Sequence, residues 1–175
     1  MPQNMRSLLI GMALSSSTVT LSLGEKTCGF CAASVSPRPM NATTAYDMVR
    51  GLDPAFIGVM ADGGNTVMEG TEDYEYQCGL LHEYLGAMGA KDAAWLRSGD
   101  FKAENKGWNF KNCSVMEGWN NWFEIFRCFR KLPAPPYMVL MPFYEVPEPQ
   151  FTQTLKDEVR YLRTIEKAVG KEMEK

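Results

Sequence analysis

The chain has 175 residues, 45% of them apolar and 22% charged, with a formal net charge of −3 at pH 7. This balance is typical of a folded globular domain rather than of a disordered chain. The basic residues are scattered instead of forming the stripe of a nucleic-acid-binding protein, and the single histidine, His82, excludes any mechanism that needs a histidine pair.

The first 24 residues contain no acidic side chain and a single charged one, Arg6. That composition is compatible with an organellar transit segment or, because residues 8–14 are apolar, with a secretory signal. Residues 7–24 are uncharged and near the length of a membrane-spanning helix, but residues 17–23 alternate polar and apolar side chains. The alternation favours a half-buried strand, and a retained targeting segment and a membrane anchor are the alternatives.

Cys28 and Cys31 form a CxxC pair shortly after this predicted strand. Such a pair is typical of a thiol redox centre or of one half of a zinc site. Pro37 and Pro39 would break the helix that a redox motif requires. The other candidate zinc ligands lack a second CxxC spacing, and they are Cys78, His82, Cys113 and Cys128. We therefore expect no bound metal or cofactor, and mostly reduced, partly buried thiols.

Helical periodicity predicts helices over residues 43–52 and 73–88, and a short one around Trp95 over residues 91–97. Between the first two, the apolar run 56–60 is followed by Asp-Gly-Gly-Asn at 62–65, which we interpret as a turn. Residues 98–112 are predicted to be an irregular loop.

An aromatic helix is predicted from about residue 116 to residue 131, because Ser114 and Glu117 have the spacing of a capping box. Five aromatic residues would share one face of it: Trp119, Trp122, Phe123, Phe126 and Phe129. We expect Trp119, Trp122 and Phe126 to be buried against the body of the protein or against a partner.

Six of the ten prolines lie between residues 133 and 149. Proline lacks the N–H group that a central strand donates, so residues 137–141 are predicted to form at most an edge strand within an extended arm. A final helix is predicted over about 155–169, and its inward side chains would be Leu155, Val159, Leu162, Ile165 and Val169.

These elements predict a helix-dominated α+β protein with about four helices and a few short strands. A compact domain would cover residues 1–132, a proline-rich extended arm residues 133–150, and a C-terminal amphipathic helix residues 151–175. The helix would pack back on the body or on a partner.

Trp, Tyr, Arg and Met are enriched at the centres of protein interfaces, and an arm without its own core needs a surface to hold it. The sequence therefore predicts a non-catalytic structural protein, a small accessory subunit that contacts other protein subunits of a larger assembly. The candidate interaction residues are Trp108, Trp119, Trp122, Phe126, Arg127, Arg130, Tyr137, Phe143 and Tyr144.

A thiol-redox or zinc-binding protein that uses Cys28 and Cys31 is the alternative. We predict no nucleic-acid partner, and contact with a membrane is left open without being predicted. The absence of acidic residues from the N-terminal segment favours an organellar localisation, and among organelles the mitochondrion is slightly favoured. Cytoplasmic or secreted localisation is the alternative.

Overall fold

The structure is a computed structural model that describes residues 9–10, 41–70, 72–97, 99, 102 and 106–174. The strand predicted at 17–23 and the Cys28–Cys31 pair lie outside the described residues.

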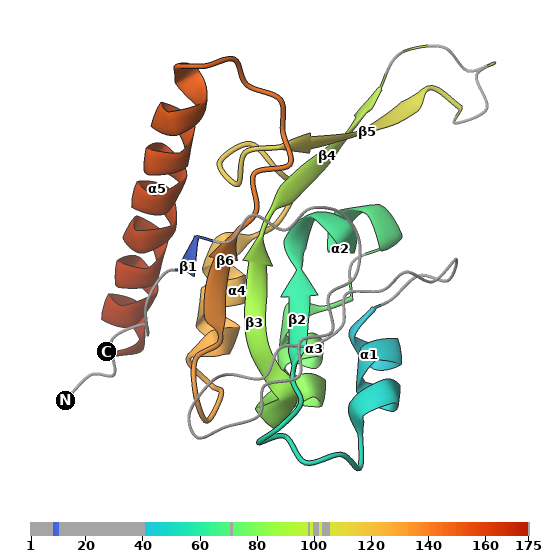
Figure 1. The fold of residues 1–175 in the computed structure, drawn as a ribbon, viewed down its shortest axis with the longest axis vertical. Coiled ribbons are helices and arrows are strands. Elements are labelled where there is room, and N and C mark those ends of the chain that lie inside the picture. Colours follow the sequence, from blue (N-terminus) through green and yellow to red (C-terminus); the bar gives the residue numbers. More distant parts are fainter. Residues whose placement is uncertain are drawn as a thin grey trace.

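The described chain contains both strands and helices (Figure 1). The strands are β1 (Leu9–Ile10), β2 (Val59–Asp62), β3 (Leu85–Ala90), β4 (Asp92–Arg97), β5 (Trp108–Cys113) and β6 (Tyr137–Leu140). The helices are α1 (Ala42–Val49), α2 (Gly63–Glu69), α3 (Tyr74–Leu81), α4 (Trp122–Phe129) and α5 (Gln150–Met173), with a 3₁₀ turn η1 at His82–Tyr84.

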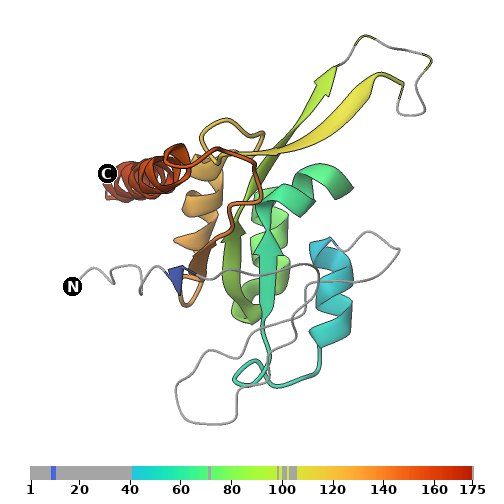
Figure 2. The same cartoon turned by 45° about the horizontal axis from the view of Figure 1, so that its top comes forward.

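Four strands form a sheet in the order β1-β6-β3-β2, and every neighbouring pair in it is parallel. β2, β3 and β6 follow one another along the chain and lie side by side, and helices cross over between them. Their carboxyl ends consequently share one edge of the sheet. β4 and β5 pair antiparallel as a hairpin that projects beyond this edge in both views (Figures 1 and 2).

The predicted helix-dominated α+β fold is wrong, because the described chain has five helices around a parallel sheet with an antiparallel hairpin beside it. The error lies mainly in residues 85–88 and 92–97, which were predicted as helix and lie in β3 and β4. α3 ends at Leu81, where the next residue, His82, has a positive φ of 39°. A residue with positive φ cannot continue a right-handed helix, so the apolar spacing beyond this point belongs to a strand.

Small residues of β3 explain why this strand resembles no ordinary β sequence. A Cβ atom added at Gly89 would lie 2.6 Å from the Sδ atom of Met141, so glycine at this position leaves room for the methionine side chain. Ala87 is fully buried in the same strand. The β-branched and aromatic residues that usually mark a strand are therefore replaced by glycine and alanine.

The aromatic segment is shorter as a helix than predicted, because α4 begins only at Trp122, with Asn121 as its N-cap. Trp122 and Phe126 are 1% and 4% exposed, which confirms their predicted burial. Trp119 is 58% exposed, so it is not buried against the body of the protein, and its burial against a partner stays a prediction. It precedes the helix, in a segment of turns between β5 and α4.

The edge strand predicted at 137–141 is also wrong, because β6 lies between β1 and β3. The prolines flank the strand and leave it free to pair: Pro136 precedes it and Pro142 follows its last residue by two positions. The predicted C-terminal helix is present and longer, and its inward residues Leu162 and Val169 are buried in the core with α4. None of the described helices is both long and apolar enough to cross a membrane.

Candidate functional site

Polar side chains gather where β2 and β3 end. Asp62 is the last residue of β2 and also the N-cap of α2, where its Oδ1 accepts a hydrogen bond of 2.9 Å from the N–H of Asn65. Lys91 directly follows β3, the neighbouring strand. The parallel pairing of the two strands therefore brings Asp62 and Lys91 to the same edge of the sheet.

The Lys91 ammonium group holds this cluster together. Its Nζ lies 3.0 Å from Asp62 Oδ2 and donates a 2.8 Å hydrogen bond to Asn65 Oδ1. The side chains of Lys91 and Asp62 are each only 10% exposed. Lys91 Nζ also lies 4.9 Å from the centre of the Phe143 ring. Such burial strengthens a charge pair and fixes both side chains, provided that their hydrogen-bonding groups are satisfied.

Two glycines at the start of α2 make room for the lysine. A Cβ atom on Gly64 would lie 2.4 Å from Lys91 Cε, and one on Gly63 would lie 2.5 Å from the Lys91 carbonyl oxygen. The Asp-Gly-Gly-Asn sequence at 62–65, interpreted above as a turn, is the junction of a buried strand and a helix. An apolar run followed by these residues was the sequence signal that could have revealed the site.

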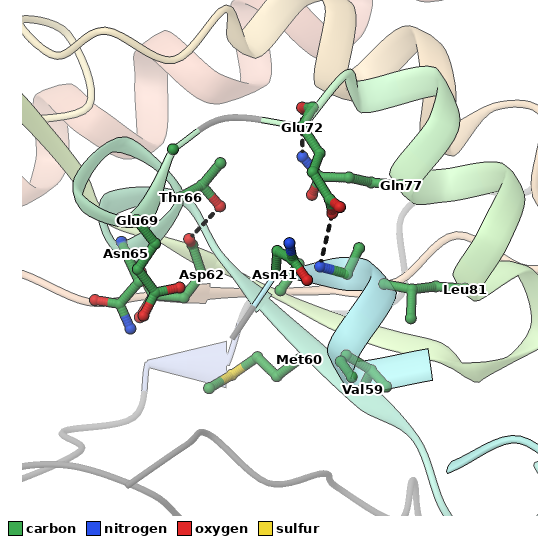
Figure 3. Close-up of a pocket in the computed structure, with 14 residues that line it drawn as sticks. Asn41, Val59, Met60, Asp62, Asn65, Thr66, Glu69, Glu72, Gln77 and Leu81 are labelled. Carbon is green, nitrogen blue, oxygen red and sulfur yellow. Dashed lines mark hydrogen bonds between the residues drawn. The ribbon is translucent and has the colours of Figure 1, made fainter. Parts of the chain in front are cut away.

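A cleft of about 70 Å³ lies along β2, between α1, α2 and α3 (Figure 3). Polar residues of α1, α2 and the start of α3 face it across the strand: Asn41, Asp62, Asn65, Thr66, Glu69, Glu72 and Gln77. Met60 and Leu81 contribute apolar walls. The volume admits several water molecules or one end of a small polar ligand.

Glu72 ties the rim of the cleft to α1. Its two carboxylate oxygens accept hydrogen bonds from the N–H of Ala42 (2.9 Å) and from Thr43 Oγ1 (2.7 Å). On the other side, Thr66 Oγ1 donates a 2.8 Å hydrogen bond to the Asp62 carbonyl oxygen (Figure 3). The cleft is thus walled by groups whose positions are set by hydrogen bonds within the protein.

Directly after Lys91, the buried Asp92 carboxylate organises the segment that leads into α4. Its Oδ1 accepts from the N–H groups of Ala93 (2.8 Å) and Trp119 (3.1 Å) and from Asn120 Nδ2 (2.7 Å). Its Oδ2 accepts from Trp122 Nε1 at 2.8 Å. Burial raises the pKa of Asp92, while these hydrogen bonds act in the opposite direction.

A second buried carboxylate, Glu158 of α5, is 1% exposed. Glu158 Oε1 accepts from the N–H of Val115 at 3.0 Å, and Oε2 accepts from Tyr144 Oη at 2.7 Å. Burial raises the pKa of Glu158, and burial together with this hydrogen bond raises the pKa of Tyr144. Glu158 thereby joins α5 to the loops after β5 and β6.

The predicted interaction residues are spread over several elements. Trp108 opens β5, is 40% exposed and lies 5.5 Å from the Arg97 guanidinium group. Arg127 pairs with Glu124 at 2.6 Å. Arg130 is exposed after α4, and Tyr137 is half-buried on β6.

The candidate zinc ligands of the described chain do not converge. Among the described residues, no three His, Cys, Asp or Glu side chains lie together as metal ligands would. Cys78 and Cys128 are buried on α3 and α4, and Cys113 is half-buried at the end of β5.

No protein-family model matches the chain, and no curated protein sequence matches it. Among solved structures, the chain is similar to the crystal structure of a xylose isomerase domain protein from Planctomyces limnophilus, with a TM-score of 0.55 and 13% sequence identity. The likeness covers 77% of this chain and 44% of that chain, so this chain spans less than half of the neighbour's length. At this identity the likeness concerns the fold alone: the consecutive parallel strands β2, β3 and β6 with their helices resemble part of a TIM-barrel-like domain.

Proposed function

We propose that the chain binds a small, hydroxyl-rich ligand at the carboxyl edge of β2 and β3. The observation that carries the proposal is the cluster of Asp62, Asn65 and Lys91, nearly buried beside the cleft along β2. In barrels and open sheets of parallel strands, ligands bind outside the carboxyl ends of the strands.

The chemistry of the cleft suits alcohol groups. A hydroxyl both donates and accepts hydrogen bonds, and the walls offer carboxylate and amide acceptors together with the amide donors of Asn41, Asn65 and Gln77. The xylose isomerase name of the similar solved structure supports a sugar or polyol as the class of ligand. The small volume of the cleft means that one end of such a molecule enters it and the remainder lies outside.

The test is calorimetric titration of the full chain with aldopentoses, aldohexoses and their reduced polyols. We expect saturable binding of at least one of them, and its loss in Asp62→Asn and Lys91→Met. Because each single change leaves one buried partner unpaired, the double variant Asp62→Asn/Lys91→Met serves as a folded, charge-neutral version of the site. Arg160→Gln, which removes an exposed pair with Asp157 on α5, is the matched control and should bind like the wild type. Absence of binding to the whole panel, or undiminished binding by the double variant, would contradict the proposal.

A second candidate function is that of an accessory subunit that contacts other protein subunits. It is favoured by two exposed indole rings, Trp108 at 40% on the projecting hairpin and Trp119 at 58% in the loop before α4. The native size of the protein in its source cells should exceed that of the isolated chain, and Trp108→Ser/Trp119→Ser should reduce it. Met48→Ser is the control, because Met48 is equally exposed on α1. Migration of the wild-type protein at its own mass would refute this function.

A further inference from the structure

A second cavity lies between α4, α5 and the start of β6. It measures about 140 Å³ and shares no lining residue with the cleft along β2. Two of its lining residues are charged, Arg130 and Glu166. The rest of its wall is apolar and consists of Phe126, Phe129, Leu132, Pro135, Pro136 and Met138.

The apolar wall is held in place by the core. The Phe126 and Phe129 rings of α4 pack edge to face with their centres 6.0 Å apart, and Met138 of β6 is 1% exposed. The fixed φ of proline restricts the backbone at Pro135 and Pro136. An apolar cavity of roughly 150 Å³ holds a benzene molecule. This cavity therefore admits an apolar group the size of a leucine or phenylalanine side chain.

Arg130 directly follows α4 and reaches across to α5. A Cβ atom on Gly170 would lie 3.3 Å from Arg130 Nη2, so glycine at this position leaves room for the guanidinium group against α5. Glu166 precedes Gly170 by four positions and is half-buried. Residues four positions apart lie on one helix face, so the guanidinium group lies about one helical turn along α5 from Glu166.

Neither of these two charges has a partner within the part of the chain that the structure describes. No hydrogen bond or ion pair joins the side chain of Arg130 or of Glu166 to another described group, and the two do not pair with each other. A guanidinium group presents a fork of N–H donors that matches a carboxylate, and a carboxylate accepts hydrogen bonds from an ammonium group. The cavity therefore offers one place for an anionic group and one for a cationic group beside an apolar space.

We propose that this cavity binds a free α-amino acid with an apolar side chain. The carboxylate of the ligand accepts hydrogen bonds from Arg130, its ammonium group donates to Glu166, and its side chain enters the cavity. A simple carboxylic acid would bring its negative charge close to Glu166, and a simple amine would bring its positive charge close to Arg130. A zwitterion complements both charges. This inference does not depend on the ligand site at β2 and β3.

The experiment is calorimetric titration of the full chain with leucine, methionine, phenylalanine and glycine. We expect saturable binding of at least one of the three apolar amino acids and none of glycine, which has no side chain to fill the cavity. The amide of the best-binding amino acid lacks the carboxylate, and its N-acetyl derivative lacks the ammonium charge. Each should bind at least about tenfold more weakly, because a hydrogen bond between charged groups is lost. The two derivatives also resemble the two ends of a peptide, so they distinguish a free amino acid from a peptide as the ligand.

Arg130→Gln and Glu166→Gln test the two charges separately. Arg130→Gln should remove the preference for the amino acid over its amide, and Glu166→Gln should remove the preference over its N-acetyl derivative. Arg163→Gln, at an exposed position of α5 outside the cavity, is the matched control and should bind like the wild type. Circular dichroism checks that each variant is folded, and the comparison of derivatives needs the wild type alone.

Three outcomes would overturn the proposal. Absence of saturable binding of all three apolar amino acids would show that the cavity is not a site for them. Equal binding of glycine, of the amide or of the N-acetyl derivative would show that the cavity or one of the charges plays no part. Undiminished binding and unchanged preference in folded Arg130→Gln or Glu166→Gln would place the bound amino acid elsewhere on the protein.

Discussion

We expect the two buried carboxylates, Asp92 and Glu158, to respond to different degrees to the same chemical change, the replacement of a carboxylate by an amide of equal size. Every partner of the Asp92 side chain is a hydrogen-bond donor: Oδ1 accepts four hydrogen bonds of 2.7–3.3 Å, and Oδ2 accepts one of 2.8 Å from the Trp122 indole N–H. In Asp92→Asn the amide must turn its NH₂ group toward a donor, and the orientation with fewest conflicts places it against Trp122 Nε1.

Two buried donors are then unsatisfied, the indole N–H and the new amide. Each costs about 1–3 kcal/mol, so we expect Asp92→Asn to lower the free energy of unfolding by about 2–6 kcal/mol. Glu158→Gln should cost no more than about 1 kcal/mol, because the amide oxygen can still accept from Val115 and the amide NH₂ can donate to the Tyr144 hydroxyl, which rotates to accept.

The assay is urea unfolding followed by circular dichroism, with stabilities compared only where the m-values agree. A double-mutant cycle with Trp122→Phe isolates the predicted conflict, since the penalty of Asp92→Asn should shrink once the indole N–H is gone. Equal losses for the two amide variants, or a cycle without coupling between positions 92 and 122, would refute the reasoning.

The remaining predictions concern the core and its pH dependence. Trp122→Ala should lower the free energy of unfolding by about 3–5 kcal/mol in urea unfolding, whereas Trp119→Ala, at an exposed site, should change it by less than about 0.5 kcal/mol. Gly118→Ala should also destabilise the protein in that assay, because the new Cβ would lie 2.0 Å from the Asp92 carboxyl carbon and cannot avoid it. Burial raises the pKa of Glu158 in the folded state, so folding favours its protonated form. The wild type should therefore gain stability relative to Glu158→Gln as the pH falls from neutral toward about 4.3, the ordinary glutamate pKa, and an unchanged difference between pH 7 and pH 5 would contradict this.

The spacing of apolar residues predicted correctly those elements in which its period matched the secondary structure that formed. The C-terminal helix and the burial of Trp122 and Phe126 follow from apolar residues at helical spacing. Residues 85–90 have apolar residues at the same spacing but form a strand, which pairs with β2 on one side and β6 on the other. The position of β6 in the sheet was predicted wrongly because the prolines of residues 133–149 were counted over the whole segment. By position, all of them lie outside the strand.

The candidate site was hidden for a different reason. Asp62 is the last residue of β2 and Lys91 directly follows β3, and only the parallel pairing of these two strands brings them together. Residues 62–65 form the junction between β2 and α2, but their sequence was interpreted as a turn because turns and strand-to-helix junctions use the same residue types. Because residues 91–97 were interpreted as a helix, Lys91 was not recognised as the residue that follows a strand. The pairing of that strand with β2, which places Lys91 beside Asp62, was therefore not predicted.

The hydrogen bonds of Lys91 and Asp92 couple the geometry of the candidate site to the stability of the sheet edge where β2 and β3 end. Lys91 engages the start of α2 through Asp62, while Asp92 engages the segment before α4 through Asn120. Asn120 closes the circuit, because its Nδ2 also donates to the Gly63 carbonyl oxygen at 3.0 Å and its Oδ1 accepts from Tyr74 Oη at 2.9 Å. Two consecutive residues thus brace the helix start that presents Asp62 to the cleft. We therefore expect a change that releases the Asp92 carboxylate from its donors to disturb the candidate site through Gly63, even though Asp92 itself lies outside the cleft.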